Sequence, residues 1–209
     1  DEKRLKQAID TLAEGIELLQ DWELRTRFTE MQTAYRYMLD YMRQGMPDPD
    51  RERLHAELIG RCYIINDQIA VARLTEHSTK VYCQMRRKYK NLAALGGIYD
   101  RLKENAANFA VTESLPASEC KSERLQLTQE HERLLSELFG TIWSSIAWNK
   151  GDAELIDHIV GDEEISINDR ATAVSAITLS TLKCFEPIKI EALCHIAINS
   201  CSTLAVRAI

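Results

Sequence analysis

The chain has 209 residues, of which 45% are hydrophobic and 28% are charged, and its formal net charge is −6. This composition excludes a disordered chain, which lacks the apolar residues to bury a core, and a globally basic nucleic-acid-binding protein. No apolar run approaches the roughly 20 residues that a membrane-spanning helix requires, so we expect no membrane partner. Only 8 glycines and 4 prolines interrupt the sequence, which predicts few turns and long elements.

The first 50 residues predict a helical hairpin. Leucine and isoleucine recur every three or four positions over residues 2–20, which is typical of an amphipathic helix. Asp21 is placed to cap a second helix over residues 22–44. Because the connection is short, we expect the two helices to be antiparallel. Gly45 to Asp50 contains two prolines and ends the second helix.

The middle of the chain predicts longer and less regular helices. A third helix is expected over residues 51–74, continuing through a kink near His77 into the segment VYCQMRRKYKNL. Gly96-Gly97 predicts a break or a point of close packing before a helix over residues 98–111. Residues 112–122 are the most polar stretch, and we expect a loop there between possible subunits 1–111 and 122–209.

The last third predicts shorter, closely spaced helices, after a long one over residues 122–148. Ser166 and Asp169 fit a capping box, and Pro187 fits the first turn of a helix. A final helix begins near Ser202 and stops at Ile209, like an array interrupted in mid-element. The chain also begins with Asp1 rather than Met, so we expect it to be part of a longer product. Leu204, Val206 and Ile209 should then pack back onto the preceding helices or lie exposed.

These patterns together predict an all-α protein of about eight to ten helices, because no segment shows sustained two-residue alternation. We expect one domain over residues 1–209, built of antiparallel helical hairpins that stack as an α-solenoid-like array or a layered bundle.

One run resembles a known repeat family. Asp169-Arg170-Ala171-Thr172-Ala173-Val174-Ser175-Ala176-Ile177 is similar to the helix of HEAT-type repeats, and Val206-Arg207-Ala208 resembles a second such start. The upstream hairpins resemble tetratricopeptide-like pairs but lack that family's Trp, Gly and Tyr pattern. The resemblance implies a helical-repeat scaffold with a binding role and no catalytic residues.

The histidines and cysteines predict no catalytic, cofactor or metal site. Glu52 and His55 form a single E-x-x-H, whereas di-iron bundles need two such motifs and two further glutamates. Glu154 and His158 lie one helical turn apart, and Cys194 and His195 are neighbours that point in different directions on a helix. No nucleotide-binding or hydrolase motif occurs.

The six cysteines show no Cys-x-x-Cys spacing. They are Cys62, Cys83, Cys120, Cys184, Cys194 and Cys201. Most lie among apolar neighbours. We expect these cysteines to be small core residues of a protein in a reducing, cytoplasmic compartment, and not to form disulfides.

Two charged segments stand out. In the first segment, basic residues interleave with Tyr82 and Tyr89. The basic residues are Lys80, Arg86, Arg87, Lys88 and Lys90. Such a mixture can hold phosphates and stack bases, but it also fits a solvated helix face whose tyrosines pack inward, which we favour. Residues 151–169 contain seven acids and no Lys or Arg, which fits either helix-start preferences or a negative rim for a basic partner.

The second helix carries Tyr35, Tyr37 and Tyr41, which cannot all face the core, so Tyr37 and Tyr41 are candidate partner contacts together with the basic segment. We predict a protein-interaction or scaffolding role, with another protein or further domains of the same chain as partner. The alternatives are a nucleic-acid-binding or regulatory helical domain using residues 80–90, and a helical enzyme without a recognisable motif.

Overall fold

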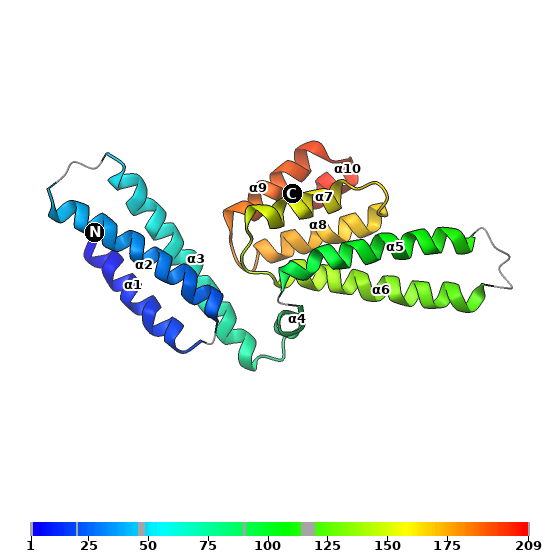
Figure 1. Cartoon of the computed structure of the whole chain (residues 1–209), viewed down its shortest axis with the longest axis horizontal. Coiled ribbons are helices and arrows are strands. Elements are labelled where there is room, and N and C mark those ends of the chain that lie inside the picture. Colours follow the sequence, from blue (N-terminus) through cyan, green and yellow to red (C-terminus); the bar gives the residue numbers. More distant parts are fainter. Residues whose placement is uncertain (1, 20, 46–48, 90, 114–119, 209) are drawn as a thin grey trace. The chain divides into compact units, whose positions relative to one another are not determined.

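The computed structural model describes residues 2–19, 21–45, 49–89, 91–113 and 120–208, which form ten α-helices and one short 3-10 helix (Figure 1). Within these ranges there is no strand, so the predicted all-α class is confirmed. The chain divides into two units, residues 1–77 and 78–209, called here the N-terminal and C-terminal units. The predicted boundary loop over residues 112–122 lies largely outside the described residues, and the helices on either side of it pack together in the C-terminal unit.

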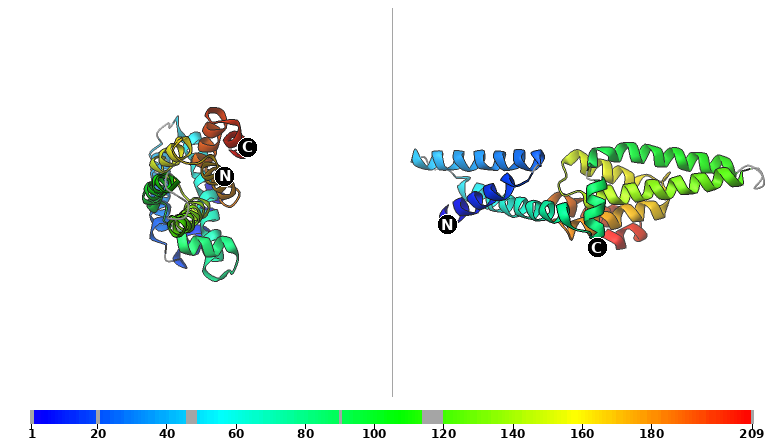
Figure 2. Two further views of the ribbon diagram at one scale, coloured as in Figure 1. Left: turned by 90° about the vertical axis from the view of Figure 1, so that its right-hand side faces the viewer. Right: turned by 90° about the horizontal axis from the view of Figure 1, so that it is seen from below.

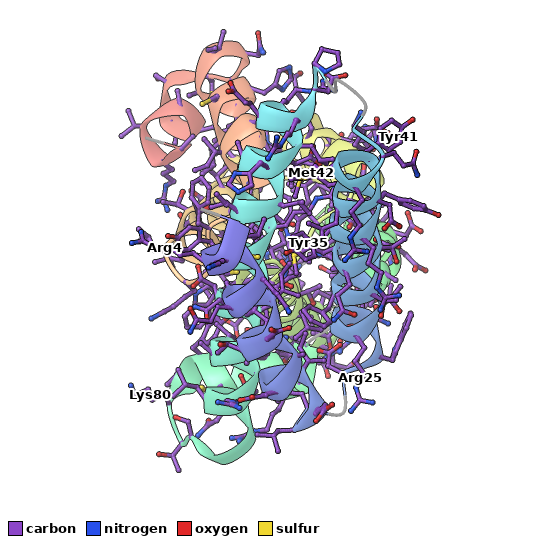
Figure 3. All side chains as sticks on the ribbon, turned by 90° about the vertical axis from the view of Figure 1, so that its left-hand side faces the viewer. Arg4, Arg25, Tyr35, Tyr41, Met42 and Lys80 are labelled. Atoms are coloured by element: carbon purple, nitrogen blue, oxygen red, sulfur yellow. The ribbon has the colours of Figure 1, made fainter. Side chains whose placement is uncertain are left out.

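The N-terminal unit is a three-helix bundle of α1 (Glu2–Glu17), α2 (Trp22–Arg43) and α3 (Arg51–His77), each packed on the other two. The five predicted apolar positions of α1 are all buried: Leu5, Ile9, Leu12, Ile16 and Leu19. The Asp21 side chain caps α2 by accepting from the Leu24 amide at 3.0 Å, as the sequence indicates. In Figure 3, Tyr35 points between the helices, whereas Tyr41 lies on the outer side of α2.

The C-terminal unit contains the remaining eight elements. They are α4 (Val81–Tyr89), η1 (Leu92–Ala94), α5 (Leu95–Glu113), α6 (Lys121–Ser144), α7 (Lys150–Gly161), α8 (Ile167–Thr181), α9 (Pro187–Asn199) and α10 (Ser202–Ala208). Helices α5 and α6 lie side by side as a long hairpin (Figures 1 and 2). Helix α8 lies at the centre, with α6, α7, α9 and α10 packed around it.

The central place of α8 follows from its small residues. Ala171, Ala173 and Ala176 are buried beside Val174 and Ile177, so neighbouring helices can approach on several sides. The Ser166 hydroxyl accepts from the Asp169 amide at 3.2 Å, which is the N-cap half of the predicted capping box, whereas the Asp169 carboxylate pairs with His131. Leu204 of α10 is buried in the same core, whereas Val206 is 74% exposed. Ile209 lies outside the described residues.

Three local predictions are wrong. Gly96 and Gly97 lie inside α5, and a methyl group added at either would meet nothing within 4 Å, so they mark neither a break nor close packing. Helix α6 ends at Ser144, before the predicted end near residue 148. Ile59 and Leu125 belong to the apolar patterns of the helices predicted over residues 51–74 and 122–148, which places them in the core, but both are exposed.

Candidate binding surfaces

The basic segment is divided between the two sides of α4. On the inner side, Arg86 donates to the Ser144 carbonyl oxygen at 2.7 Å, and the Tyr82 ring meets Trp143 edge-on at 5.3 Å between centroids. The Tyr89 ring lies against Gly140 of α6, where an added Cβ would come within 2.4 Å of it. The tyrosines and one arginine of this segment are therefore packing groups, not a free basic and aromatic stripe.

The other basic residues face solvent. Lys80, Arg87 and Lys88 are exposed, and Lys90 lies outside the described residues. Arg87 donates to the Ser78 carbonyl oxygen at 3.0 Å, and the Lys88 ammonium lies 4.7 Å from the centre of the Tyr89 ring. Arg87 and Lys88 line a groove of about 770 Å³, together with Gly97 and Arg101 of α5. We call it the α4–α5 groove.

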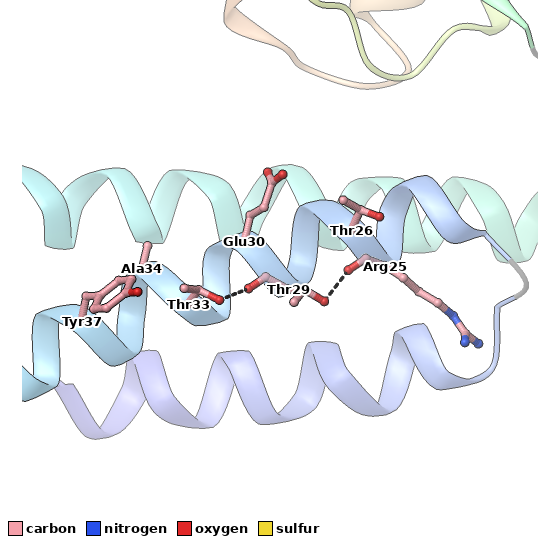
Figure 4. Close-up of a pocket in the computed structure, with 7 residues that line it drawn as sticks. All are labelled: Arg25, Thr26, Thr29, Glu30, Thr33, Ala34 and Tyr37. Atoms are coloured by element: carbon pink, nitrogen blue, oxygen red, sulfur yellow. Dashed lines mark hydrogen bonds between the residues drawn. The ribbon is translucent and has the colours of Figure 1, made fainter.

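The outward face of α2 carries a row of exposed, uncharged residues, which are Trp22, Thr26, Thr29, Thr33 and Tyr37. We call this row the α2 outer face. Trp22 is 77% exposed and Tyr37 is 67% exposed, and Tyr41 at one edge is 53% exposed. Part of this face forms a hollow of about 560 Å³ that runs from Arg25 to Tyr37 (Figure 4). The structure thus brings the sequence-predicted Tyr37 and Tyr41 to one surface, but in a different unit from the basic segment.

The threonines of the α2 outer face donate to their own helix. Thr26, Thr29 and Thr33 donate to the carbonyl oxygens four residues earlier, at 3.0, 2.9 and 2.8 Å. Figure 4 draws two of these bonds. Because each hydroxyl proton already has an acceptor, a partner can cover these residues without leaving a buried donor unpaired.

A further groove of about 720 Å³ lies between α1 and α3, and sequence reasoning did not predict it. Leu5 and Leu12 line it from α1, and Ile59 and Tyr63 line it from α3. Tyr63 and Ile59 are exposed there. In the sequence, Ile59 and Tyr63 lie four residues apart and follow the buried Leu58 and Cys62, and this second apolar pair is the signal that could have revealed the surface.

Most carboxylates of the acidic segment 151–169 contact other residues of the same chain. Asp152 completes a capping box with Asn149 at the start of α7. Asp157 pairs with His195 at 2.7 Å, and Asp169 pairs with His131 at 3.3 Å. Asp162 accepts from the Tyr99 hydroxyl and lies 3.2 Å from the Lys103 ammonium, which also binds Glu164 at 2.6 Å. Lys103 of the same chain is therefore the counter-ion of both Asp162 and Glu164.

These contacts shift the pKa values of Asp162, Lys103 and Tyr99. The Tyr99 hydrogen bond, the Glu164 amide and Lys103 together lower the pKa of Asp162 to about 2. Hydrogen bonds to Glu164 and Asp162 raise the pKa of Lys103, and burial with the Asp162 contact raises the pKa of Tyr99. The cluster is a fixed ion pair that joins α5 to the turn after α7.

A second polar cluster, which sequence reasoning missed, surrounds the side chain of Lys189, which is 0% exposed. Its ammonium donates to the Ser145 and Ile146 carbonyl oxygens at 2.8 and 3.0 Å and to the Ser180 hydroxyl at 2.9 Å. Glu186 accepts from the Trp148 amide at 2.8 Å. Burial lowers the pKa of Lys189 to about 8, and the Glu186 carboxylate opposes that shift. This cluster holds the non-helical link between α6 and α7.

The histidines of the pairs considered for catalysis contact other parts of the chain or line a groove. His158 contacts the Tyr99 hydroxyl at 3.2 Å, and His195 is bound to Asp157 rather than to Cys194. His55 lines the α1–α3 groove. Among the described residues, no group of three or more His, Cys, Asp or Glu side chains could hold a metal ion. All six cysteines are free thiols, and Cys194 and Cys201 are exposed.

Comparisons with protein-family models, with curated proteins and with solved structures find no match to this chain. None of the helices in the described ranges is both long enough and apolar enough to cross a bilayer.

Proposed function

We propose that this protein is a protein-binding helical module and that the α2 outer face is one of its binding surfaces. The observation that carries the proposal is the exposure of Trp22 and Tyr37 along one face of a helix whose opposite face is fully used by the core. Trp and Tyr are the residues most enriched among those that dominate binding energy at protein interfaces. The partner is another protein or a further domain of the same chain.

The α2 outer face suits a helix or a flat protein surface. Threonine and alanine between the two aromatic ends allow close approach of a second backbone, while the ends supply area. Glu30 and Arg25 flank the row, and Arg25 is fixed by two bonds to the Leu19 carbonyl oxygen at 2.7 and 3.2 Å. A partner would thus meet a surface with ordered edges, which lowers the entropy lost on binding.

The scaffold and repeat interpretation of residues 164–209 stays a prediction. It is supported by the HEAT-like run in α8 and by the succession of short helices α7 to α10. It adds no further residue to the proposed binding surface.

A photo-reactive amino acid at Thr29, introduced into the chain in its native host, tests the proposal. We expect a discrete cross-linked protein that disappears when Trp22 and Tyr37 are both changed to alanine, because each truncation should weaken binding at least about tenfold. The control carries the same amino acid at Asp10, an exposed position of α1. Identical products from Thr29 and Asp10, or products that survive the double alanine change, would contradict the proposal.

A further inference from the structure

The α4–α5 groove has a cationic rim. Among the described residues that line it, three are cationic and one is a carboxylate, namely Arg87, Lys88, Arg101 and Glu137. Arg101 lies 3.3 Å from Glu130 and 3.7 Å from Glu137, and Arg133 binds both of these carboxylates. The two acids are thus matched by two arginines. In the described part of the chain no carboxylate pairs with Lys88, whose contact is the Tyr89 ring face.

Part of the groove lining consists of small, exposed residues. Ala93, Ala94 and Gly97 line it, and a methyl group built on Gly97 would meet nothing within 4 Å. The volume of about 770 Å³ falls in the range of about 300–1,000 Å³ that is typical of small-molecule sites. A flat group could therefore lie against these small residues while an anionic group reaches Arg87 and Lys88.

The basic residues do not form a track for a polymer. Arg86 is turned inward to the Ser144 carbonyl oxygen, and Lys80 stands at the other end of α4, about two helical turns from Lys88. Non-specific binding of a nucleic acid requires cations spaced along the phosphate backbone. A short ligand with a concentrated negative charge fits this arrangement better.

We propose that the α4–α5 groove binds a compact phosphate-bearing ligand of nucleotide size. The Arg87 guanidinium and the Lys88 ammonium bind the phosphate oxygens, since charge-assisted hydrogen bonds from these groups are the strongest available. The remainder of the ligand lies on Ala93, Ala94 and Gly97. This site is separate from the α2 outer face and does not depend on the protein partner proposed for it.

Isothermal titration of the full chain with four probes tests the proposal: ATP, inorganic pyrophosphate, adenosine and a single-stranded oligonucleotide. We expect ATP and pyrophosphate to bind, with affinity that falls as salt is raised, and adenosine to bind far more weakly than ATP. Absence of binding by both phosphates at low salt would overturn the proposal. Equal affinity for adenosine and ATP, or binding of the oligonucleotide alone, would overturn it as well.

Two variants locate the site, with one matched control. Lys88→Glu should weaken ATP and pyrophosphate at least about tenfold, whereas Lys80→Glu, the same charge change on an exposed residue, should change them less than about twofold. Gly97→Leu should block ATP but spare pyrophosphate, without loss of thermal stability, because the added side chain enters open space. Equal losses in the Lys88 and Lys80 variants would refute a localised site.

Discussion

The ammonium group of Lys189 lies 2.8 Å from the carbonyl oxygen of Ser145, although the two residues are 44 positions apart in the sequence, and both are buried. The bond satisfies a carbonyl at the point where α6 ends and the chain turns towards α7. Buried backbone carbonyls without donors are costly, so this lysine substitutes for the helical bonds that the link cannot make. A charged residue at the centre of the C-terminal unit is thus a structural element.

Replacing Lys189 by methionine should destabilise the C-terminal unit by about 2–4 kcal/mol. The volume is nearly kept, but the Ile146 carbonyl oxygen and the Ser180 hydroxyl lose a donor, at about 1–3 kcal/mol each. Urea unfolding followed by tryptophan fluorescence in a Trp22→Phe background reports this unit through Trp143 and Trp148. Lys183→Met, at an exposed lysine, should change stability by less than about 0.5 kcal/mol. Equal effects of the two changes would show that the Lys189 bonds contribute little.

Because of Lys189, the free energy of unfolding should increase at alkaline pH. Burial lowers its pKa from the ordinary 10.5 to about 8, so the folded chain releases this proton before the unfolded chain does. Between these pH values the unfolded state binds more protons, and the free energy of unfolding therefore rises with pH, by about 3 kcal/mol at most. Urea titrations from pH 7.5 to 10.5 should show this rise in the unaltered chain and not in Lys189→Met. A parallel pH dependence in both proteins would rule it out.

Two glycines provide a matched test of packing. Gly140→Ala should cost about 1–3 kcal/mol, because the new methyl group would overlap the Tyr89 ring and displace α4. Gly97→Ala, also within a helix, should be neutral or stabilising by up to about 1 kcal/mol, since it enters open space and favours the helix. Urea midpoints of the two variants give the comparison. If both substitutions act alike, the Tyr89–Gly140 contact is not a close one.

Helical periodicity in the sequence predicts the features that depend on residues close together in the chain, such as helix starts and buried positions. The five apolar positions of α1 are all buried, and the Asp21, Ser166 and Pro187 helix starts occur where the sequence indicates them. Each of these features depends on residues three or four positions apart. The width of a buried stripe depends on the neighbouring helix instead, which is why Ile59 and Leu125 were misplaced.

The remaining errors come from contacts between distant segments. Nothing near Lys189 in the sequence indicates that its acceptors are in residues 145, 146 and 180, and two of these residues lie in the link that follows α6. Gly140 lies within a regular helical pattern, so only the position of Tyr89 reveals why it is a glycine. The inward turn of Arg86 likewise depends on Ser144, 58 residues away.

Asp162→Asn should reduce stability at neutral pH but not in strong acid. The folded-state pKa of this carboxyl is about 2, below its ordinary 3.8, so its stabilising effect is fully present above about pH 4 and lost as the pH falls towards 2. The variant should have a lower urea midpoint at pH 7, and the difference should shrink by pH 2.5. Glu163→Gln, the same charge change at the adjacent exposed position, should leave the midpoint nearly unchanged. A gap that persists at pH 2.5 would assign the effect to something other than ionisation.

The α2 outer face should be dispensable for folding. Trp22→Ala with Tyr37→Ala removes two exposed rings and should change the free energy of unfolding of the N-terminal unit by less than about 1 kcal/mol. Phe28→Ala, on the buried side of the same helix, should cost about 3–5 kcal/mol. Circular dichroism during urea unfolding compares the two. A large loss in the double variant would mean that these rings stabilise the bundle itself, and the case for an interface on α2 would then lose its main support.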